Sequence, residues 1–316
     1  MPVIFGKAPG KIILFGEHAV VYGQPAIAVP VLDVAATARV TPLLGAEPGK
    51  VHVQAHDIHL DTLLSDLPED HPIGAAIRAT LAEITPEHTP AFTIQLDSTI
   101  PISAGMGSGA AVTVAIIRAL SAFLGRPLPD ERVSELAYEV EKLHHGTPSG
   151  IDNTVVTYQR PVYFQRGEAL QTLVLSHPTH WVIADTGGKT PTRETVSAVR
   201  NLHDSAPETY DAIFAEIGEI VREARQALIQ GDLPHLGGLM NRNQSLLEAL
   251  QVSSPGLEAL IAAARGDGAI GAKLSGGGRG GNMIALAPPE KVRQVEKALQ
   301  DAGAVRVLTT TLREAA

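Results

Sequence analysis

The chain has 316 residues, of which 44% are apolar, so it can bury a substantial core. Its length is more typical of two domains than of one. Its 25 Lys and Arg residues against 34 Asp and Glu residues give a net charge of −9, spread without blocks of one sign, which excludes a general nucleic-acid-binding surface. The absence of cysteine excludes a disulfide framework, a thiolate zinc site and a cysteine nucleophile.

No segment predicts export or insertion into a membrane. Lys7 and Lys11 interrupt the apolar run at the N-terminus, which therefore lacks the order of a signal peptide. The longest apolar stretch, roughly 109–125, contains Arg118 and is too short to cross a bilayer. We therefore expect a soluble, cytoplasmic protein with neither a nucleic acid nor a membrane as partner.

The first half of the chain predicts one layered α/β structure. We expect strands at 3–8, 12–15, 26–40 and 91–96, and helices at 72–83, 108–124 and 130–145. In the last helix, Val133, Leu136, Ala137, Val140 and His144 share one face, and Gly146 is a stop signal. Residues 43–70 are too mixed for a prediction.

The second half predicts a split β-α-β order with extra helices inserted. A β-rich segment at 154–174 precedes a strand at 181–185 and helices at 193–203, 208–230, 233–250 and 256–265. Strands at 271–274, 282–287 and 305–311, with a helix at 289–301 before the last strand, complete the chain. We place the domains at residues 1–177 and 178–316.

Residues 101–111 form a loop of glycines and small residues that runs into an apolar helix. Glycine lets the backbone approach an anion closely, and the helix beginning near Ser108 presents free N–H groups and the positive end of its dipole. No Lys-Ser or Lys-Thr follows the glycines, so this is not a Walker loop, and the spacing of a dinucleotide fingerprint is missing. The loop indicates a nucleotide site, with a tight turn that caps a buried helix as the alternative.

Three other segments carry polar groups that suit catalysis. Residues 9–23 place Lys11 on a strand that ends in a glycine-bounded loop with Glu17 and His18. Glu141 is followed, after a helix stop, by a turn-rich loop that ends at Asp152. Residues 273–282 concentrate glycine between two strands, which suits close approach of the backbone to a ligand.

The segments 9–23, 101–111 and 273–281 resemble, in this order, the three motifs of the kinase superfamily named after galactokinase, homoserine kinase, mevalonate kinase and phosphomevalonate kinase (GHMP). Residues 16–23 and 145–153, and Asp185-Thr186-Gly187 with Thr192 downstream, are most similar to the mevalonate kinase family. The resemblance spans nearly the whole chain. It implies a two-domain α+β fold, with an N-terminal α/β domain, a C-terminal ferredoxin-like domain with extra helices, and an active site in the cleft between them.

The resemblance implies ATP-dependent phosphorylation of the C5 hydroxyl of mevalonate in isoprenoid biosynthesis, with ATP as co-substrate and Mg²⁺ as cofactor. Asp152 would accept or orient the hydroxyl proton, Lys11 would neutralise developing charge, and Ser108 and Glu141 would bind Mg²⁺. The residues implied to bind the nucleotide are Pro101, Ser103, Ala104, Gly105, Met106, Gly107, Ser108, Gly109, Ala110 and Ala111. Those implied to contact the substrate or its phosphates are Glu17, His18, Thr192, Gly276, Gly277 and Gly278.

Ordinary structural roles stand beside these assignments. Asp152 could cap a helix, Lys11 could be a solvated strand residue, and Glu141 could lie on an ordinary helix face. His18 could be a loop histidine with satisfied hydrogen bonds, and the pair His144 and His145 fits a helix end better than a metal site. The rival functions are another GHMP kinase, acting on phosphomevalonate, the mevalonate 3-hydroxyl, a sugar or homoserine, a decarboxylase of the same pathway, and a non-catalytic nucleotide-binding regulator.

Three positions depart from the superfamily pattern. Gly109 stands where a second hydroxyl residue is usual, Met106 replaces leucine, and Arg279 stands where glycine is frequent. Ser108 keeps the first hydroxyl, so Gly109 would lose only a secondary phosphate contact, while Arg279 would be either a cation near the phosphates or a surface guanidinium. Members of this family often form homodimers, which leaves a homodimer open for this chain.

Overall fold

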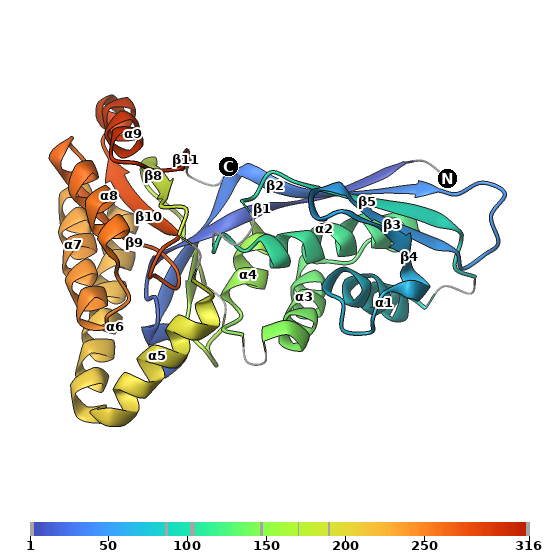
Figure 1. The fold of residues 1–316 in the computed structure, drawn as a ribbon, viewed down its shortest axis with the longest axis horizontal. Coiled ribbons are helices and arrows are strands. Elements are labelled where there is room, and N and C mark those ends of the chain that lie inside the picture. The colour runs from blue at the N-terminus through green and yellow to red at the C-terminus, as the bar shows by residue number, and fades with distance from the viewer. Residues whose placement is uncertain are drawn as a thin grey trace. The chain divides into compact units, whose positions relative to one another are not determined.

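A computed structural model describes residues 3–85, 88–101, 105–145, 148–169, 171–188 and 190–313. The chain divides into two compact units, which interleave along the sequence (Figure 1). The first unit contains residues 1–11, 30–102 and 106–159, and the second contains residues 12–29, 103–105 and 160–316. The domain division after residue 177 stays a prediction.

In the part of the first unit that the structure describes, four α-helices lie beside a mixed set of strands. The strands are β1 (Ile4–Phe15) and β2 (Ala26–Pro42), of which this unit holds parts, with β3 (Val51–Ala55), β4 (Leu60–Leu63) and β5 (Phe92–Ser98). The helices are α1 (Pro72–Ile84), α2 (Ser108–Phe123), α3 (Asp130–His145) and α4 (Ile151–Tyr158). β2 and β4 lie antiparallel to their neighbours β5 and β3, whereas β3 and β5 are parallel to each other.

α2 is the buried centre of this unit, and its small residues explain how it packs. A Cβ atom at Gly6 of β1 would lie 2.2 Å from the carbonyl oxygen of Ala115, so only glycine lets the strand approach the helix this closely. α2 in turn contacts α1, α3 and α4. At the C-terminal end of α4, Arg118 of α2 donates a hydrogen bond to the carbonyl of Thr157. The arginine that interrupts the apolar stretch of α2 therefore holds two helices together.

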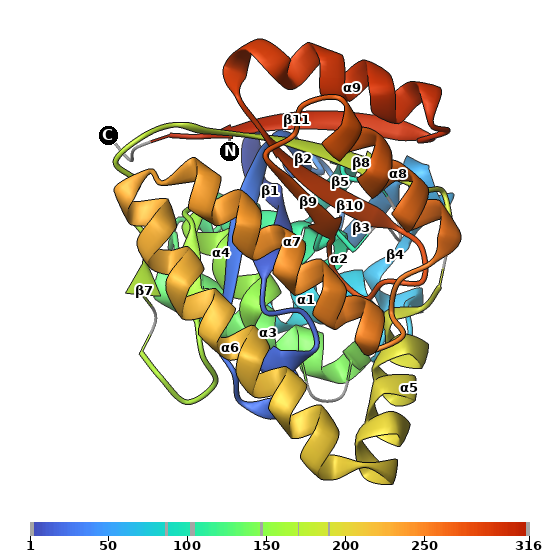
Figure 2. The same cartoon turned by 90° about the vertical axis from the view of Figure 1, so that its left-hand side faces the viewer.

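The second unit contains an antiparallel sheet in the order β11-β8-β10-β9. Its strands are β8 (Thr179–Asp185), β9 (Gly271–Leu274), β10 (Asn282–Ala287) and β11 (Arg306–Leu312), and the short strands β6 (Val162–Phe164) and β7 (Gln171–Thr172) pair elsewhere. Its helices are α5 (Thr192–Ser205), α6 (Pro207–Gln230), α7 (Leu233–Ala249), α8 (Pro255–Gly266) and α9 (Val292–Asp301). α8 and α9 pack on this sheet, and α6 runs beside α7 (Figure 2). The predicted split β-α-β order is confirmed, with α5, α6 and α7 as the extra helices.

Two predicted elements were wrong in part. β1 is one strand, not two, because Gly10, the glycine between the expected strands, does not adopt a positive φ and the strand continues through it. Within 154–174, predicted to be β-rich, Thr154–Tyr158 belongs to α4, since the β-branched side chains there are buried against α2 and α3 and tertiary packing overrides their strand propensity. The unassigned segment 43–70 contains β3, whose alternately buried residues are a strand signal.

Candidate active site

The first unit brings Lys11 and Asp152, 141 positions apart in the printed sequence, into one ion pair. The Lys11 ammonium lies 3.0 Å from Oδ1 of Asp152, and the two side chains are 6% and 27% exposed. Lys11 is fixed by β1, and its own N–H donates a hydrogen bond to the carbonyl of Met106 at 3.0 Å. Asp152 lies in the first turn of α4, after Gly150 in the left-handed conformation. A buried cation therefore meets a carboxylate that solvent, or a ligand, can reach.

Gly107 places the N-terminus of α2 directly against this pair. Its φ of +68° favours glycine, and a Cβ atom there would lie 2.9 Å from Cγ of Lys11 and 3.5 Å from Oδ2 of Asp152. Ser108 begins α2, and no described side chain caps that helix. The first N–H groups of a helix have no partner within it and carry the positive end of its dipole. The arrangement thus provides a seat for an anion next to a lysine and an aspartate.

The other residues of the predicted nucleotide loop surround this helix start. Met106 is buried, so the residue that replaces leucine fills a core position, and Gly105 has a positive φ of +69°. A Cβ atom at Gly109 would meet nothing within 4 Å, so the missing hydroxyl leaves open space. Ala110 and Ala111 belong to the first turn of α2, and Pro101 is buried shortly after β5. Ser103 and Ala104 lie outside the described residues.

Glu141 of α3 is a half-buried acid of the first unit. Its Oε2 atom is inaccessible to solvent and has no hydrogen-bond partner in the described parts of the chain. Burial, reinforced by the negative charge of Asp152, raises the pKa of Glu141 to about 8, and the Lys11 charge opposes the shift. An unpartnered buried carboxylate is poorly stabilised without a cation.

These donors fit Mg²⁺, which takes hard oxygen ligands and usually needs only one or two carboxylates from the protein. Glu141 supplies the orphaned oxygen, and Ser108 supplies a hydroxyl at the first residue of α2. Within the described ranges no group of three or more His, Asp or Glu residues forms a metal-binding cluster. A cation at this site would therefore rely on bound phosphate and water for its remaining ligands.

The second unit joins residues 12–18 to residues 273–278 through three contacts. The Glu17 and Lys273 side chains form an ion pair that is fully buried, and burial lowers the pKa of Lys273 although Glu17 opposes the shift. Ser275 donates a hydrogen bond from Oγ to the carbonyl of Ile13 at 2.8 Å. His18 lies with Nε2 3.1 Å from the carbonyl oxygen of Gly277. Two of the motifs found in the sequence are thus one structural element.

His18 is held as a neutral imidazole in this element. A carbonyl oxygen can only accept, so Nε2 carries the hydrogen and Nδ1 is left as an acceptor. Burial lowers the pKa of His18 to about 4, the bond to Gly277 opposes the shift, and the charges of Arg279 and Lys273 add to it. The backbone of His18 has a φ of +61°, which is uncommon for a residue with a side chain.

The lowered pKa predicts that His18 makes stability depend on pH. The unfolded histidine gains a proton as the pH falls through 6.5, whereas the folded one does so only near 4, so His18 removes stability as the pH falls through this window. We expect the wild-type protein to lose about 2 kcal/mol more unfolding free energy than His18→Gln between pH 7.5 and pH 5, as measured by urea denaturation. Parallel pH curves for the two proteins would contradict the burial of a neutral imidazole.

The remaining predicted residues are placed as follows. Gly276 and Gly278 both have positive φ, and a Cβ atom at Gly278 would lie 2.0 Å from the carbonyl oxygen of Val252. Arg279 donates from Nε to the carbonyl of Gln251, and its charge acts on His18. Thr192 begins α5, and its side chain, like those of His144 and His145, lies outside the described residues.

Two polar residues at these sites were missed by sequence reasoning. Lys273 was predicted only to lie at the start of a glycine-rich segment, yet it is a fully buried ion-pair partner. Its place between Ala272 and Leu274 in a predicted strand was the available signal. Asn153 is buried beside Asp152 and bonds to Ser134. Its sequence position gave no signal, because the partner is on another helix.

The chemistry that this geometry supports is transfer of a phosphoryl group to a hydroxyl. A helix N-terminus and a lysine stabilise phosphate charge, and an adjacent carboxylate can take a proton. Positioning and electrostatics provide most of the catalysis of such reactions.

No helix among the described residues is both long and apolar enough to span a bilayer.

Comparison with known proteins agrees with this chemistry. Residues 72–160 match the family model of the GHMP kinases N terminal domain, and residues 224–305 match that of the GHMP kinases C terminal domain. The mevalonate kinase of Thermococcus sibiricus is 37% identical over 98% of this chain and 97% of its own length, and that of Pyrococcus horikoshii is 36% identical over 98% and 96%.

A solved structure gives the same result. The crystal structure of L. major mevalonate kinase in complex with R-mevalonate is 29% identical, with a TM-score of 0.83 over 100% of this chain and 97% of that one. The expected α+β fold with two GHMP kinase domains is confirmed by these matches. The chain is a kinase and belongs to the mevalonate kinase family of the GHMP superfamily.

Proposed function

We propose that this protein transfers the γ-phosphoryl group of ATP to the C5 hydroxyl of mevalonate, giving 5-phosphomevalonate and ADP. The observation that carries the proposal is the Lys11–Asp152 ion pair of 3.0 Å beside the start of α2. The relatives that cover nearly the whole chain are named mevalonate kinases, and one solved relative was crystallised with R-mevalonate.

In the proposed reaction, the hydroxyl oxygen forms a bond to the γ-phosphorus while the bond from that phosphorus to the bridging oxygen of ADP breaks. Asp152 orients the hydroxyl and accepts its proton, and Lys11 stabilises the negative charge on the attacking oxygen. The N–H groups that begin α2 hold the phosphate oxygens, and Gly276, Gly277 and Gly278 contribute further contacts. Glu17, His18 and Thr192 position the substrate.

Mg²⁺ would be held by Glu141 and Ser108, and it would neutralise charge on the nucleotide phosphates. The unpartnered Oε2 atom of Glu141 supports this role. A cytoplasmic location and a homodimer stay predictions that follow from the family resemblance.

The decisive experiment is a panel of acceptors assayed for ADP release with ATP and Mg²⁺. We expect mevalonate to be turned over at least 100-fold more efficiently, in kcat/KM, than phosphomevalonate, homoserine or galactose, and phosphorus NMR to place the phosphate on C5. Phosphate on the 3-hydroxyl, or preference for another acceptor, would replace the proposed activity with that of a different kinase. Nucleotide binding without ADP release from any acceptor would indicate a regulator.

A further inference from the structure

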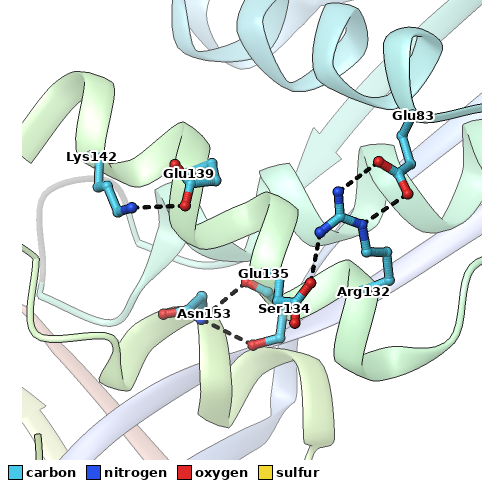
Figure 3. A network of polar contacts seen from close by, with 7 residues as sticks. All are labelled: Glu83, Arg132, Ser134, Glu135, Glu139, Lys142 and Asn153. Carbon is cyan, nitrogen blue, oxygen red and sulfur yellow. Dashed lines mark hydrogen bonds and ion pairs between the residues drawn. The ribbon is translucent and has the colours of Figure 1, made fainter. Parts of the chain in front are cut away.

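Asn153 connects the helix that carries Asp152 to the helix that carries Glu141. Its side-chain amide is buried and donates from Nδ2 to the carbonyl oxygen of Ser134 at 3.1 Å and to the hydroxyl of Ser134 at 2.9 Å (Figure 3). Ser134 belongs to α3, whereas Asn153 follows Asp152 in the first turn of α4. The contact therefore fixes one helix against the other within one residue of the aspartate.

α4 is too short to hold its own orientation. It has eight residues, its N-cap residue Gly150 has no side chain, and a single hydrogen bond of 3.3 Å, donated by the N–H of Ile151 to Oγ of Ser149, caps its start. Isolated helices of this length are unstable, so tertiary contacts must set the direction of the first turn. Arg118 holds the far end of the helix through the carbonyl of Thr157. At the near end, the double contact to Ser134 holds the turn that contains Asp152.

The position of Ser134 on α3 makes this contact relevant to the site. Ser134 and Glu141 are seven residues apart, which is about two helical turns, so both lie on nearly the same side of α3. The side that receives Asn153 is thus the side from which Glu141 projects. The contact therefore sets the place of Asp152 relative to Glu141.

The buried amide of Asn153 stabilises the fold less than an apolar side chain of similar size would. Oδ1 of Asn153 is buried and has no hydrogen-bond partner in the part of the chain that the structure describes. A buried acceptor without a partner is destabilising, whereas an apolar side chain of similar size avoids that cost. Leucine would therefore serve packing alone, and what distinguishes asparagine is the directed pair of hydrogen bonds.

We propose that Asn153 is a positioning residue for catalysis: by bonding to Ser134 it holds the Asp152 carboxylate in the place from which it acts on the acceptor hydroxyl. This inference rests on the proposed phosphoryl transfer. Misplacement of a reacting group by about 1 Å can cost on the order of 100-fold in rate. The role of Asn153 is thus exerted through Asp152, with no contact to the substrate.

Asn153→Leu tests this role without an obligatory loss of stability. We expect kcat with mevalonate to fall about 10- to 100-fold, with KM for mevalonate and for ATP changed less than about 3-fold and the melting temperature within about 3 °C of wild type. Ser134→Ala removes one of the two acceptors, so kcat should fall about 3- to 5-fold. The double variant should be no slower than Asn153→Leu alone, because both changes break the same interaction.

Thr157→Val is the matched control. Thr157 lies on the same helix, is fully buried, and its hydroxyl has no partner among the described residues, so the isosteric change should leave kcat within about 2-fold of wild type. Wild-type kcat in folded Asn153→Leu would overturn the proposal. Additive losses in the double variant would overturn it too. If the leucine variant folds poorly, Ser134→Ala alone is decisive, and a wild-type kcat in that variant would overturn the proposal.

The outcome is distinguishable from failure of the proposed function. The acceptor panel on the wild-type protein tests the reaction, whereas the Asn153 series is scored relative to wild type on whichever acceptor that panel identifies. Wild-type turnover of mevalonate together with an unaffected Asn153→Leu would remove the positioning role and leave the reaction standing.

Discussion

Asp152→Asn is expected to lower kcat by roughly 10³-fold or more while the protein stays folded and binds nucleotide. Asparagine has the same shape and can still accept a hydrogen bond from Lys11, but it cannot take a proton from the acceptor hydroxyl. The Asp152 side chain is partly exposed to solvent. Removing the negative charge of Asp152 therefore destabilises the Lys11 ammonium less than it would at a site without solvent access. Steady-state kinetics and nucleotide titration measure the two quantities.

Asp130→Asn is the control for removing one negative charge from the same unit. Asp130 pairs with Arg118 at 2.8 Å, and its side chain is 51% exposed, so this change should alter kcat less than about 2-fold. If Asp152→Asn kept more than about a tenth of wild-type turnover, Asp152 would only orient the hydroxyl, with a small contribution to the rate, and would not be a proton acceptor.

Glu141→Gln is expected to raise the Mg²⁺ concentration needed for half-maximal activity by about 10-fold and to lower kcat by about 10- to 100-fold. The amide keeps the size of the side chain but offers the cation a neutral oxygen. A Mg²⁺ titration at saturating substrates measures both effects. An unchanged titration would contradict the assignment of Glu141 as a ligand.

The same substitution should stabilise the protein without ligands at high pH. The folded pKa of Glu141, about 8, lies above the ordinary value of 4.5 for a glutamate, so its contribution to stability is fully present below pH 4.5 and is lost as the pH rises through 8. We expect Glu141→Gln to melt higher than wild type by on the order of 5 °C at pH 8.5 and the difference to vanish near pH 4.5.

Glu135→Gln on the same helix separates this effect from a general change in charge. Glu135 is exposed and paired with Arg132, whose other partner is Glu83 of α1 (Figure 3). It should change neither the Mg²⁺ requirement nor the pH dependence of melting. Equal behaviour of the two variants would show that burial of Glu141 has no special consequence.

Much of the fold could be predicted from the sequence because local patterns agree with tertiary packing. The helices α2 and α3 and the strand order of the second half were predicted from periodicity and from glycine or proline at their ends. α4 was not predicted, because its run of β-branched residues favours a strand and only the contacts with α2 and α3 reverse that preference.

The candidate site divides in the same way. The sequence by itself determined the family and the chemical types at the site, because glycine-rich loops, a lysine on a predicted strand and a carboxylate after a turn can each be recognised from a local stretch of residues. Only the tertiary structure decided which groups meet: Lys11 with Asp152, Glu17 with Lys273, and Asn153 with Ser134. Their hydrogen bonds and burial arise where distant segments pack together, and no local pattern records that packing.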